Sequence, residues 1–160
     1  MKQHPPLLPV IIGTGFGAGF WPWGPGTAGA VLATVVWYLL SLVLTNCQLT
    51  LVTCTLIVVF TAAGTWATAR LQPYWGDDPG RVVVDEMVGV WIPLLVAATP
   101  PHQPLLAIAA LLLFRLFDIV KPLGIRSLDQ RRGAFWVMAD DIVAGIYSLL
   151  VLWAGKAILQ

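Results

Sequence analysis

The sequence is short of charge, and most of its first half has none. Charged residues make up 11% of the 160 residues, whereas a soluble domain normally carries about 25%. From Gln3 to Ala69 there is no Lys, Arg, Asp or Glu, and 58% of the chain is hydrophobic. This composition excludes an ordinary soluble domain and predicts an integral membrane protein. The formal net charge of +1 also gives no reason to expect nucleic acid as a partner.

Histidine and cysteine are scarce as well, with two residues of each: His4, His102, Cys47 and Cys54. The cysteine spacing fits no metal site, so we expect both cysteines to act as small apolar residues. Both histidines stand apart from the acidic residues described below, and His102 is expected on the opposite face of the membrane. Chemistry through a phosphohistidine or a cysteinyl phosphate is therefore excluded, because the chain offers no suitable nucleophile for it.

Five apolar segments can enter a membrane, at about 28–45, 49–69, 82–98, 105–120 and 137–159. A span needs roughly 17–25 residues, so the third and fourth segments are marginal, and Pro93 should kink the third. Residues 5–20 are apolar but rich in glycine, which favours an interfacial or re-entrant segment. The predicted fold is all-α: a polytopic helical membrane protein with about five membrane-embedded helices, the N-terminal segment, and one domain over 1–160.

The connections between these segments differ in charge. Two of them, 70–81 and 121–133, carry basic residues, while the other two carry none. The positive-inside rule then places the basic connections and the N-terminus in the cytoplasm, and the C-terminus outside. Lys156 is the one basic residue on the wrong side, and its long side chain can reach the outer interface.

All eight acidic residues lie between Asp77 and Asp141, and five sit inside or at the edge of apolar stretches. These five are Asp85, Glu86, Asp118, Asp140 and Asp141. A charge at the centre of a membrane helix costs roughly 2.5–3.5 kcal/mol, so such residues need a partner or a chemical task. The predicted topology brings all five to the cytoplasmic ends of their helices, where we expect them to converge.

Two of the acidic motifs are adjacent pairs at helix starts, Asp85-Glu86 and Asp140-Asp141. Compensation of the helix dipole, worth about 0.3–1 kcal/mol, needs only one acid per helix. Hard oxygen ligands from several helices suit Mg²⁺ or Mn²⁺, so we predict a metal site. Gly89 and Gly145 each follow an acid by four residues and would let a neighbouring helix or a ligand approach.

Arg115, Asp118 and Lys121 recur every three residues at the end of the fourth segment and share one side of a helix. They form either an ion-pair ladder or, as we expect from the depth of Arg115, a phosphate-binding set with Asp118 as a further metal ligand.

A glycine turn, Gly24-Pro25-Gly26-Thr27, precedes the first apolar segment. It matches the dinucleotide-binding glycine pattern, but no strand precedes it, so a nucleotide-binding fold is rejected. Free N–H groups at a helix start can still bind an anion, which makes Gly24, Gly26 and Thr27 candidate phosphate contacts. An N-cap role for Thr27 is the alternative.

At these residues the chain resembles the phosphatidylglycerophosphatase A family. The matching stretches are GFGAGFWPWGPGTAGA, VVVDEMVGVWIPLL, FRLFDIVKPLGIRSLDQ and VMADDIVAG, in the family's order. The resemblance implies a multi-pass, Mg²⁺-dependent phosphatase of the bacterial inner membrane, with its site facing the cytoplasm. The implied substrate is phosphatidylglycerophosphate, a phospholipid, and the implied product is phosphatidylglycerol. The five acids carry over as catalytic and metal-binding residues, and Arg115 and Lys121 as phosphate contacts.

The chain departs from the family pattern at two places. Ala30 stands where the family commonly has Ser, and the segment QRRGAFWVMA is bulkier and slightly shorter than expected. The resemblance leaves open whether water or an Asp attacks the phosphorus. The competing hypothesis is a small cation transporter or channel subunit, which would need acids distributed across the bilayer.

Overall fold

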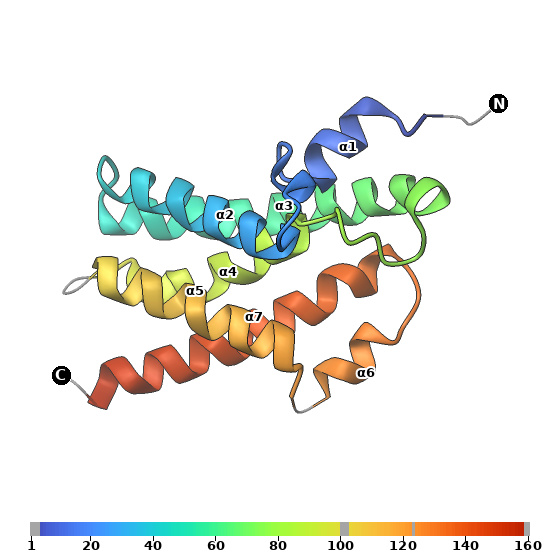
Figure 1. Ribbon diagram of the computed structural model, residues 1–160. Coiled ribbons are helices and arrows are strands. Elements are labelled where there is room, and N and C mark those ends of the chain that lie inside the picture. The colour runs from blue at the N-terminus through green and yellow to red at the C-terminus, as the bar shows by residue number, and fades with distance from the viewer. Residues whose placement is uncertain (1–3, 100–102, 123, 159–160) are drawn as a thin grey trace.

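The computed structural model describes residues 4–99, 103–122 and 124–158, and over these residues it is all-α (Figure 1). His102 therefore lies outside the described residues. The helices are α1 (Leu7–Gly13), the 3₁₀ helix η1 (Ala18–Phe20), α2 (Pro25–Ser41), α3 (Asn46–Trp75), α4 (Val84–Ala97), α5 (Gln103–Val120), α6 (Ile125–Asp129) and α7 (Ala134–Ile158). All five apolar segments predicted from the sequence are helices, and their bounds differ by a few residues.

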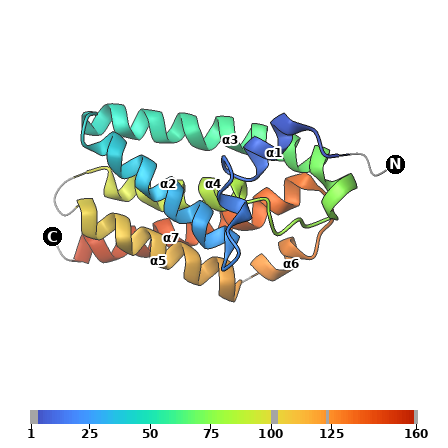
Figure 2. The ribbon, with the colours of Figure 1, turned by 45° about the horizontal axis from the view of Figure 1, so that its top comes forward.

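Helix α4 lies at the centre of the bundle, in contact with α2, α3, α5 and α7 (Figure 2). Its sequence is apolar on every side, which is typical of a helix enclosed by others rather than of an amphipathic surface helix. From Met87 to Leu94 every residue of α4 is buried, and Asp85 in its first turn is buried too. Pro93 lies inside this helix, which continues to Ala97. The core of the protein is therefore built around a helix that begins with two acids.

In the described part of the chain, three helices are long and apolar enough to cross a membrane: α3, α5 and α7. The second and fifth segments, which were expected to be long enough, are among them. Helix α2, from the first segment, has 17 residues, the lower limit of the expected range, and α5, which was expected to be marginal, has 18. Much of α3 and α5 is exposed in the isolated chain. These surfaces are apolar, as a lipid-facing helix requires.

The N-terminal region contains more helix than its glycines suggested. Leu7–Gly13 forms α1, which packs against α3, and η1 follows it after a tight turn. Gly15 and Gly17 take up positive φ angles of 53° and 100° in this turn, a conformation that glycine adopts without steric cost. A second helix that the sequence analysis did not predict, α6, interrupts the connection between α5 and α7.

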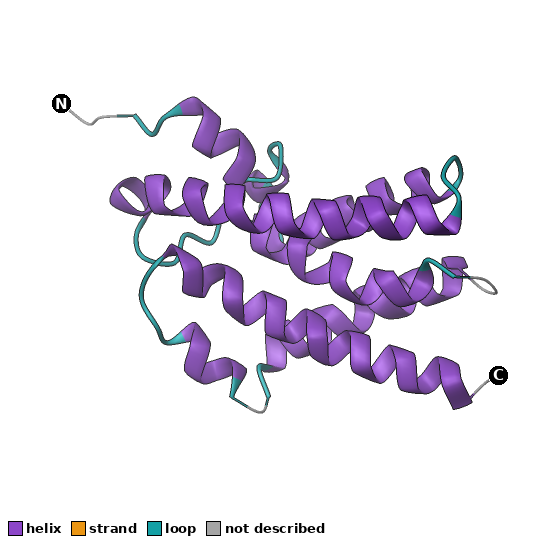
Figure 3. Cartoon of the chain, turned by 180° about the vertical axis from the view of Figure 1, so that it is seen from behind, coloured by secondary structure: helices purple, strands orange, loops and turns teal. Residues whose placement is uncertain are grey.

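The two ends of the bundle differ in what lies there. The loop between α3 and α4 and the short helix α6 lie toward one end, and the α2–α3 turn lies at the other (Figure 3). Lys156, near the end of α7, donates hydrogen bonds to the carbonyl oxygens of Val96 and Thr99 at 3.3 and 2.8 Å. It thus caps the C-terminal end of α4, the end opposite Asp85 and Glu86.

Candidate active site

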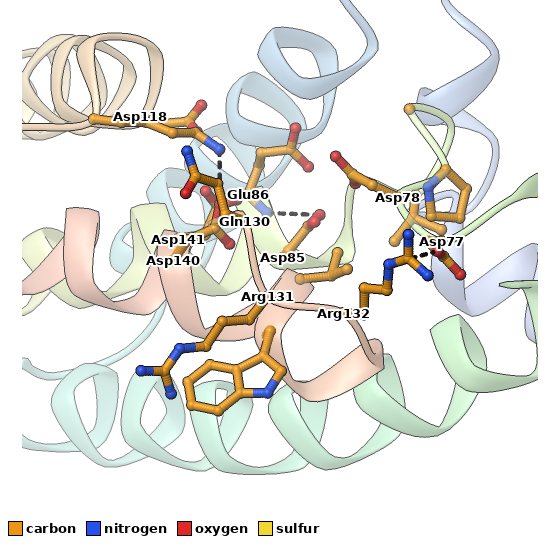
Figure 4. Close-up of a pocket in the computed structure, with 16 residues that line it drawn as sticks. Asp77, Asp78, Asp85, Glu86, Asp118, Gln130, Arg131, Arg132, Asp140 and Asp141 are labelled. Carbon is orange, nitrogen blue, oxygen red and sulfur yellow. Dashed lines mark hydrogen bonds and ion pairs between the residues drawn. The ribbon is translucent and has the colours of Figure 1, made fainter. Parts of the chain in front are cut away.

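Five acids predicted from the sequence lie together at one cavity of about 300 Å³. Asp85 and Glu86 come from the first turn of α4, Asp118 from the last turns of α5, and Asp140 and Asp141 from the second turn of α7. Figure 4 shows them directed toward one another from these three helices. The expected convergence of the motifs is thus seen in the structure for all five acids.

Three of these acids form a tighter group. Asp85, Glu86 and Asp141 each offer a carboxylate oxygen, and these oxygens lie within 4.8 Å of one another. Asp85 and Asp141 are buried and Glu86 is nearly so. Three buried carboxylates at this spacing repel one another strongly in a medium of low dielectric constant. The arrangement therefore favours a bound cation.

The other two acids are paired with basic side chains. Arg115 Nη1 lies 2.5 Å from Asp118 Oδ2, and Lys121 Nζ lies 2.8 Å from Asp140 Oδ2. The second pair joins the end of α5 to α7. Lys121 is the first residue after α5 and has a positive φ of 49°. All four side chains are largely buried. The structure thus separates the five acids into a group of three and two acids held by cations.

Arg115 also approaches the group of three. Its Nη1 lies 4.0 Å from Glu86 Oε1. Among the described residues, the buried atoms Glu86 Oε2 and Arg115 Nε have no hydrogen-bond partner. A buried polar atom without a partner is costly, and such atoms in a native protein call for a ligand. A divalent cation on Glu86 and an anion on Arg115 would satisfy both, so the donor set fits the predicted Mg²⁺.

Two glycines hold the acid-bearing helices close together. A side-chain carbon added to Gly145 in α7 would collide with the carbonyl oxygen of Gly89 in α4, and one added to Gly89 would collide with Phe114. The two helices therefore touch backbone to backbone, one turn beyond Asp85 and Asp141. The prediction that these glycines permit a close approach is confirmed, and the partner in each case is another helix.

The glycine turn at the start of α2 reaches the site through one residue. A side-chain carbon on Gly26 would collide with Glu86 Oε1 and lie 3.1 Å from Arg115 Nη1. Gly24 is the N-cap residue of α2, so the alternative of Thr27 as the N-cap was wrong. Gly24 and Thr27 are exposed and line a separate apolar groove beside Trp21 and Trp23. Of the three predicted contacts in this turn, the structure brings only Gly26 to the charged residues.

Six further polar or aromatic residues that were not predicted from the sequence line the cavity: Asp77, Asp78, Gln130, Arg131, Arg132 and Trp136. They come from the loop before α4, the loop before α7 and the first turn of α7. A signal was present, because both loops were predicted to lie at the same membrane face as the acids. The cavity therefore has buried acids at its base and exposed, mixed charges at its mouth.

Taken together, these features define a helical membrane protein whose buried acids could hold a metal ion beside two basic residues, a combination suited to phosphate chemistry. The family model for phosphatidylglycerophosphatase A matches residues 11–156. A protein of Bacteroides thetaiotaomicron named "Putative phosphatidylinositol-3-phosphatase" is 52% identical over 94% of both chains.

Two proteins named phosphatidylglycerophosphatase A are also similar. The one from Haemophilus influenzae is 35% identical over 96% of this chain and 93% of its own, and the one from Escherichia coli is 32% identical over 89% and 80%. No solved structure matches the chain. The chain belongs to the phosphatidylglycerophosphatase A family, as its motifs indicated, and is a lipid phosphatase of that family.

Proposed function

We propose that the protein hydrolyses phosphatidylglycerophosphate to phosphatidylglycerol and phosphate, with Mg²⁺ as its cofactor, in the bacterial inner membrane. The observation that carries this proposal is the group Asp85, Glu86 and Asp141 beside Arg115. Carboxylates for a cation and a guanidinium for an anion are what a phosphomonoester with bound Mg²⁺ requires. The two relatives named phosphatidylglycerophosphatase A support this choice of substrate.

Phosphatidylinositol 3-phosphate is the second candidate substrate, because the 52% identical relative is named for it. Both lipids carry a phosphomonoester on a polyol headgroup, and in both a phosphodiester joins that headgroup to diacylglycerol. The bond that breaks is the same in each case. The two substrates differ in the shape of the polyol, which lies between the two phosphates.

The chain's own residues can perform the binding steps of this hydrolysis. Asp85, Glu86 and Asp141 would hold Mg²⁺, which when bound would offset the negative charge on the phosphoryl oxygens. Arg115 has a planar fork that can hold two phosphate oxygens at once. Asp118 positions this fork from one side through the 2.5 Å contact. Positioning and charge neutralisation of this kind supply most of the rate in phosphoryl transfer.

Lys121 is held in a similar way by an acid of α7. Its ammonium group donates to Asp140 at 2.8 Å and joins α5 to α7. A compact ammonium group binds phosphate as a point charge, without the planar match of Arg115. The two cations therefore offer a substrate different contacts, and both lie beside acids that keep them in place.

The competing hypothesis, cation transport, is less well supported by the arrangement of the charges. All eight acids of the chain lie between Asp77 and Asp141, and seven of them line one cavity. A transport path needs polar groups at successive depths of the bilayer. An arginine beside the acids would also oppose the passage of a cation.

Phosphate release from purified protein in mixed micelles tests the proposed function. Phosphatidylglycerophosphate and phosphatidylinositol 3-phosphate would be compared, each with Mg²⁺ and with EDTA. We expect release from the first lipid to be faster and to stop with EDTA. Release from neither lipid would contradict the proposal, and faster release from the inositol lipid would replace the substrate.

Orientation can be tested by cysteine labelling in intact cells. We propose that the cavity faces the cytoplasm, so Gln103→Cys should react with a membrane-impermeant reagent and Gln130→Cys should be protected. The native Cys47 and Cys54 are exposed in the isolated chain, so both would first be changed to Ser. Labelling of position 130 from outside would place the cavity on the opposite face.

A further inference from the structure

The mouth of the cavity carries a second pair of basic side chains, distinct from Arg115 and Lys121. Arg131 and Arg132 lie in the loop between α6 and α7 and are exposed, yet both line the same cavity as the buried acids. Figure 4 shows Arg132 directed toward Asp77 in the facing loop, and Arg131 beside an indole ring. One continuous cavity thus has positive charge both at its base and at its mouth.

The ion pair of Arg132 is weak enough to be exchanged for a ligand. Its Nε lies 3.6 Å from Asp77 Oδ2, and the two side chains are 89% and 68% exposed. Exposed pairs of this kind contribute about 0–1 kcal/mol, because water and salt screen them. Two phosphate oxygens that accept hydrogen bonds from the same guanidinium are a better partner for it than a single distant carboxylate oxygen. An anionic ligand at the mouth can therefore displace Asp77.

Arg131 is held in a different manner. Its guanidinium carbon lies 4.3 Å from the centre of the Trp136 ring. Stacking on an aromatic face restrains a guanidinium while its N–H groups at the edge remain able to donate. The mouth thus offers one restrained and one exchangeable guanidinium, both belonging to the loop that leads into α7.

We propose that Arg131 and Arg132 bind the phosphodiester of the substrate headgroup while its phosphomonoester lies at the buried acids. This assignment rests on the proposed function. It makes the two arginines determinants of specificity for lipids that carry two phosphates separated by a polyol. The lipids that appear in the names of all three relatives carry two phosphates separated by a polyol. The assignment therefore does not depend on which polyol the natural substrate contains.

Two soluble compounds can separate this role from general attraction to a membrane. Deacylated phosphatidylglycerophosphate has both phosphates, whereas glycerol phosphate has only the monoester. Their inhibition constants would be measured against hydrolysis of the lipid substrate. For the unmodified protein we expect the compound with two phosphates to bind about ten-fold more tightly, which corresponds to one additional charged contact.

The double variant Arg131→Gln/Arg132→Gln should remove most of that ten-fold preference and leave inhibition by glycerol phosphate unchanged. Arg126→Gln is the matched control, because Arg126 is an exposed arginine of α6 outside the cavity lining. Equal weakening of both compounds, or an unchanged preference, would overturn the assignment. A wild-type protein that hydrolyses no phosphorylated lipid would instead defeat the proposed function itself.

Asp77→Asn tests the exchange step independently. Because the substitution removes the carboxylate that competes for Arg132, the compound with two phosphates should bind about two-fold more tightly. Binding of glycerol phosphate should stay the same. Weaker binding of the compound with two phosphates would show that Asp77 positions Arg132 for the ligand and does not compete with it, which would refute the exchange.

Discussion

The two ends of α4 differ in how completely their charged groups are hydrogen-bonded within the apolar bundle. At the C-terminal end, the single ammonium group of Lys156 is satisfied by the oxygens of Val96 and Thr99. At the N-terminal end, five acids meet two cations, and a buried oxygen of Glu86 has no partner among the described residues. The charges at both ends interact favourably with the helix dipole, because the dipole favours acids at the start of a helix and a cation at its end.

Dipole compensation accounts fully for the Lys156 end and only in part for the other. One acid would suffice for the dipole of α4, and the structure brings three carboxylates within 4.8 Å. A protein selected only for stability would avoid such a group, because like charges in a low-dielectric site destabilise the fold. The excess of acids is what the proposed metal site requires, so substitutions at the two ends should differ in kind.

The largest effect is expected at the group of three acids. Asp85→Asn, Glu86→Gln and Asp141→Asn should each lower the Mg²⁺-dependent rate by at least about 10²–10³-fold, because each removes charge from the site that holds the cation. The variants should still insert and fold. Without metal, we expect them to unfold at the same or a higher temperature than the unmodified protein, because mutual repulsion is reduced. Near-normal turnover in all three would rule out the metal-site assignment.

Arg115 should follow in size of effect. Arg115→Lys keeps the charge but loses the planar fork, and the loss of one charged hydrogen bond costs about 1.5–3 kcal/mol. kcat/KM should therefore fall about ten- to a hundred-fold. Arg126→Lys, on the exposed surface of α6, provides the comparison in mixed micelles and should change little. An unchanged kcat/KM in Arg115→Lys would mean that Arg115 acts only through its charge and not through its planar fork.

Arg131 and Arg132 are exposed and also line the mouth of the cavity. Their loss should therefore affect binding of the headgroup more than the rate of hydrolysis.

The close contact between α4 and α7 should have an intermediate effect on both stability and rate. Gly145→Ala places a methyl group against the Gly89 carbonyl and 3.1 Å from Ile92 Cδ1. Overpacking of this kind costs about 1–3 kcal/mol, and separation of the two helices would also move Asp141 away from Asp85. We expect a lower unfolding temperature and a higher Mg²⁺ concentration for half-maximal rate.

Gly155→Ala is the matched control for this change, because it lies on the same helix with no neighbouring atom within 4 Å. Alanine should stabilise an exposed helical position by about 0.4–1 kcal/mol. If both variants behaved alike, the backbone contact at Gly145 would not be what sets the spacing of the acids.

Much of this architecture could be predicted from the sequence because it depends on local patterns. Apolar segments of helical length predicted five of the helices. The charges of the loops predicted a topology in which the acid motifs lie at one end of the bundle. Boundaries were less predictable. Helix α3 continues through Arg70 and Pro73 to Trp75, and α2 begins at Pro25, whose fixed φ suits a first helical position.

The pairing of charges within the site could not be predicted. Lys121 and Asp140 are 19 residues apart, and their contact depends on the rotation of α7 relative to the end of α5. For the same reason, five acids with similar sequence contexts divide into three that face one another and two that face cations. The mouth of the cavity was missed because its loops have no periodic pattern, and only the fold brings Asp77 opposite Arg132.

The smallest effect should come from the other end of α4. Lys156→Met removes three hydrogen bonds to Val96 and Thr99 but keeps much of the apolar stem of the side chain. Each bond contributes about 0.5–1.5 kcal/mol at most, and exposure of Thr99 to solvent allows water to replace part of it. We therefore expect a loss of about 1 kcal/mol in the free energy of unfolding, with kcat/KM within about two-fold of the unmodified value. Thermal unfolding in detergent and kinetics on the same samples would measure both quantities. A rate loss comparable to that of Asp141→Asn would show that the two ends of α4 are coupled, and that the acids depend on how the far end is capped.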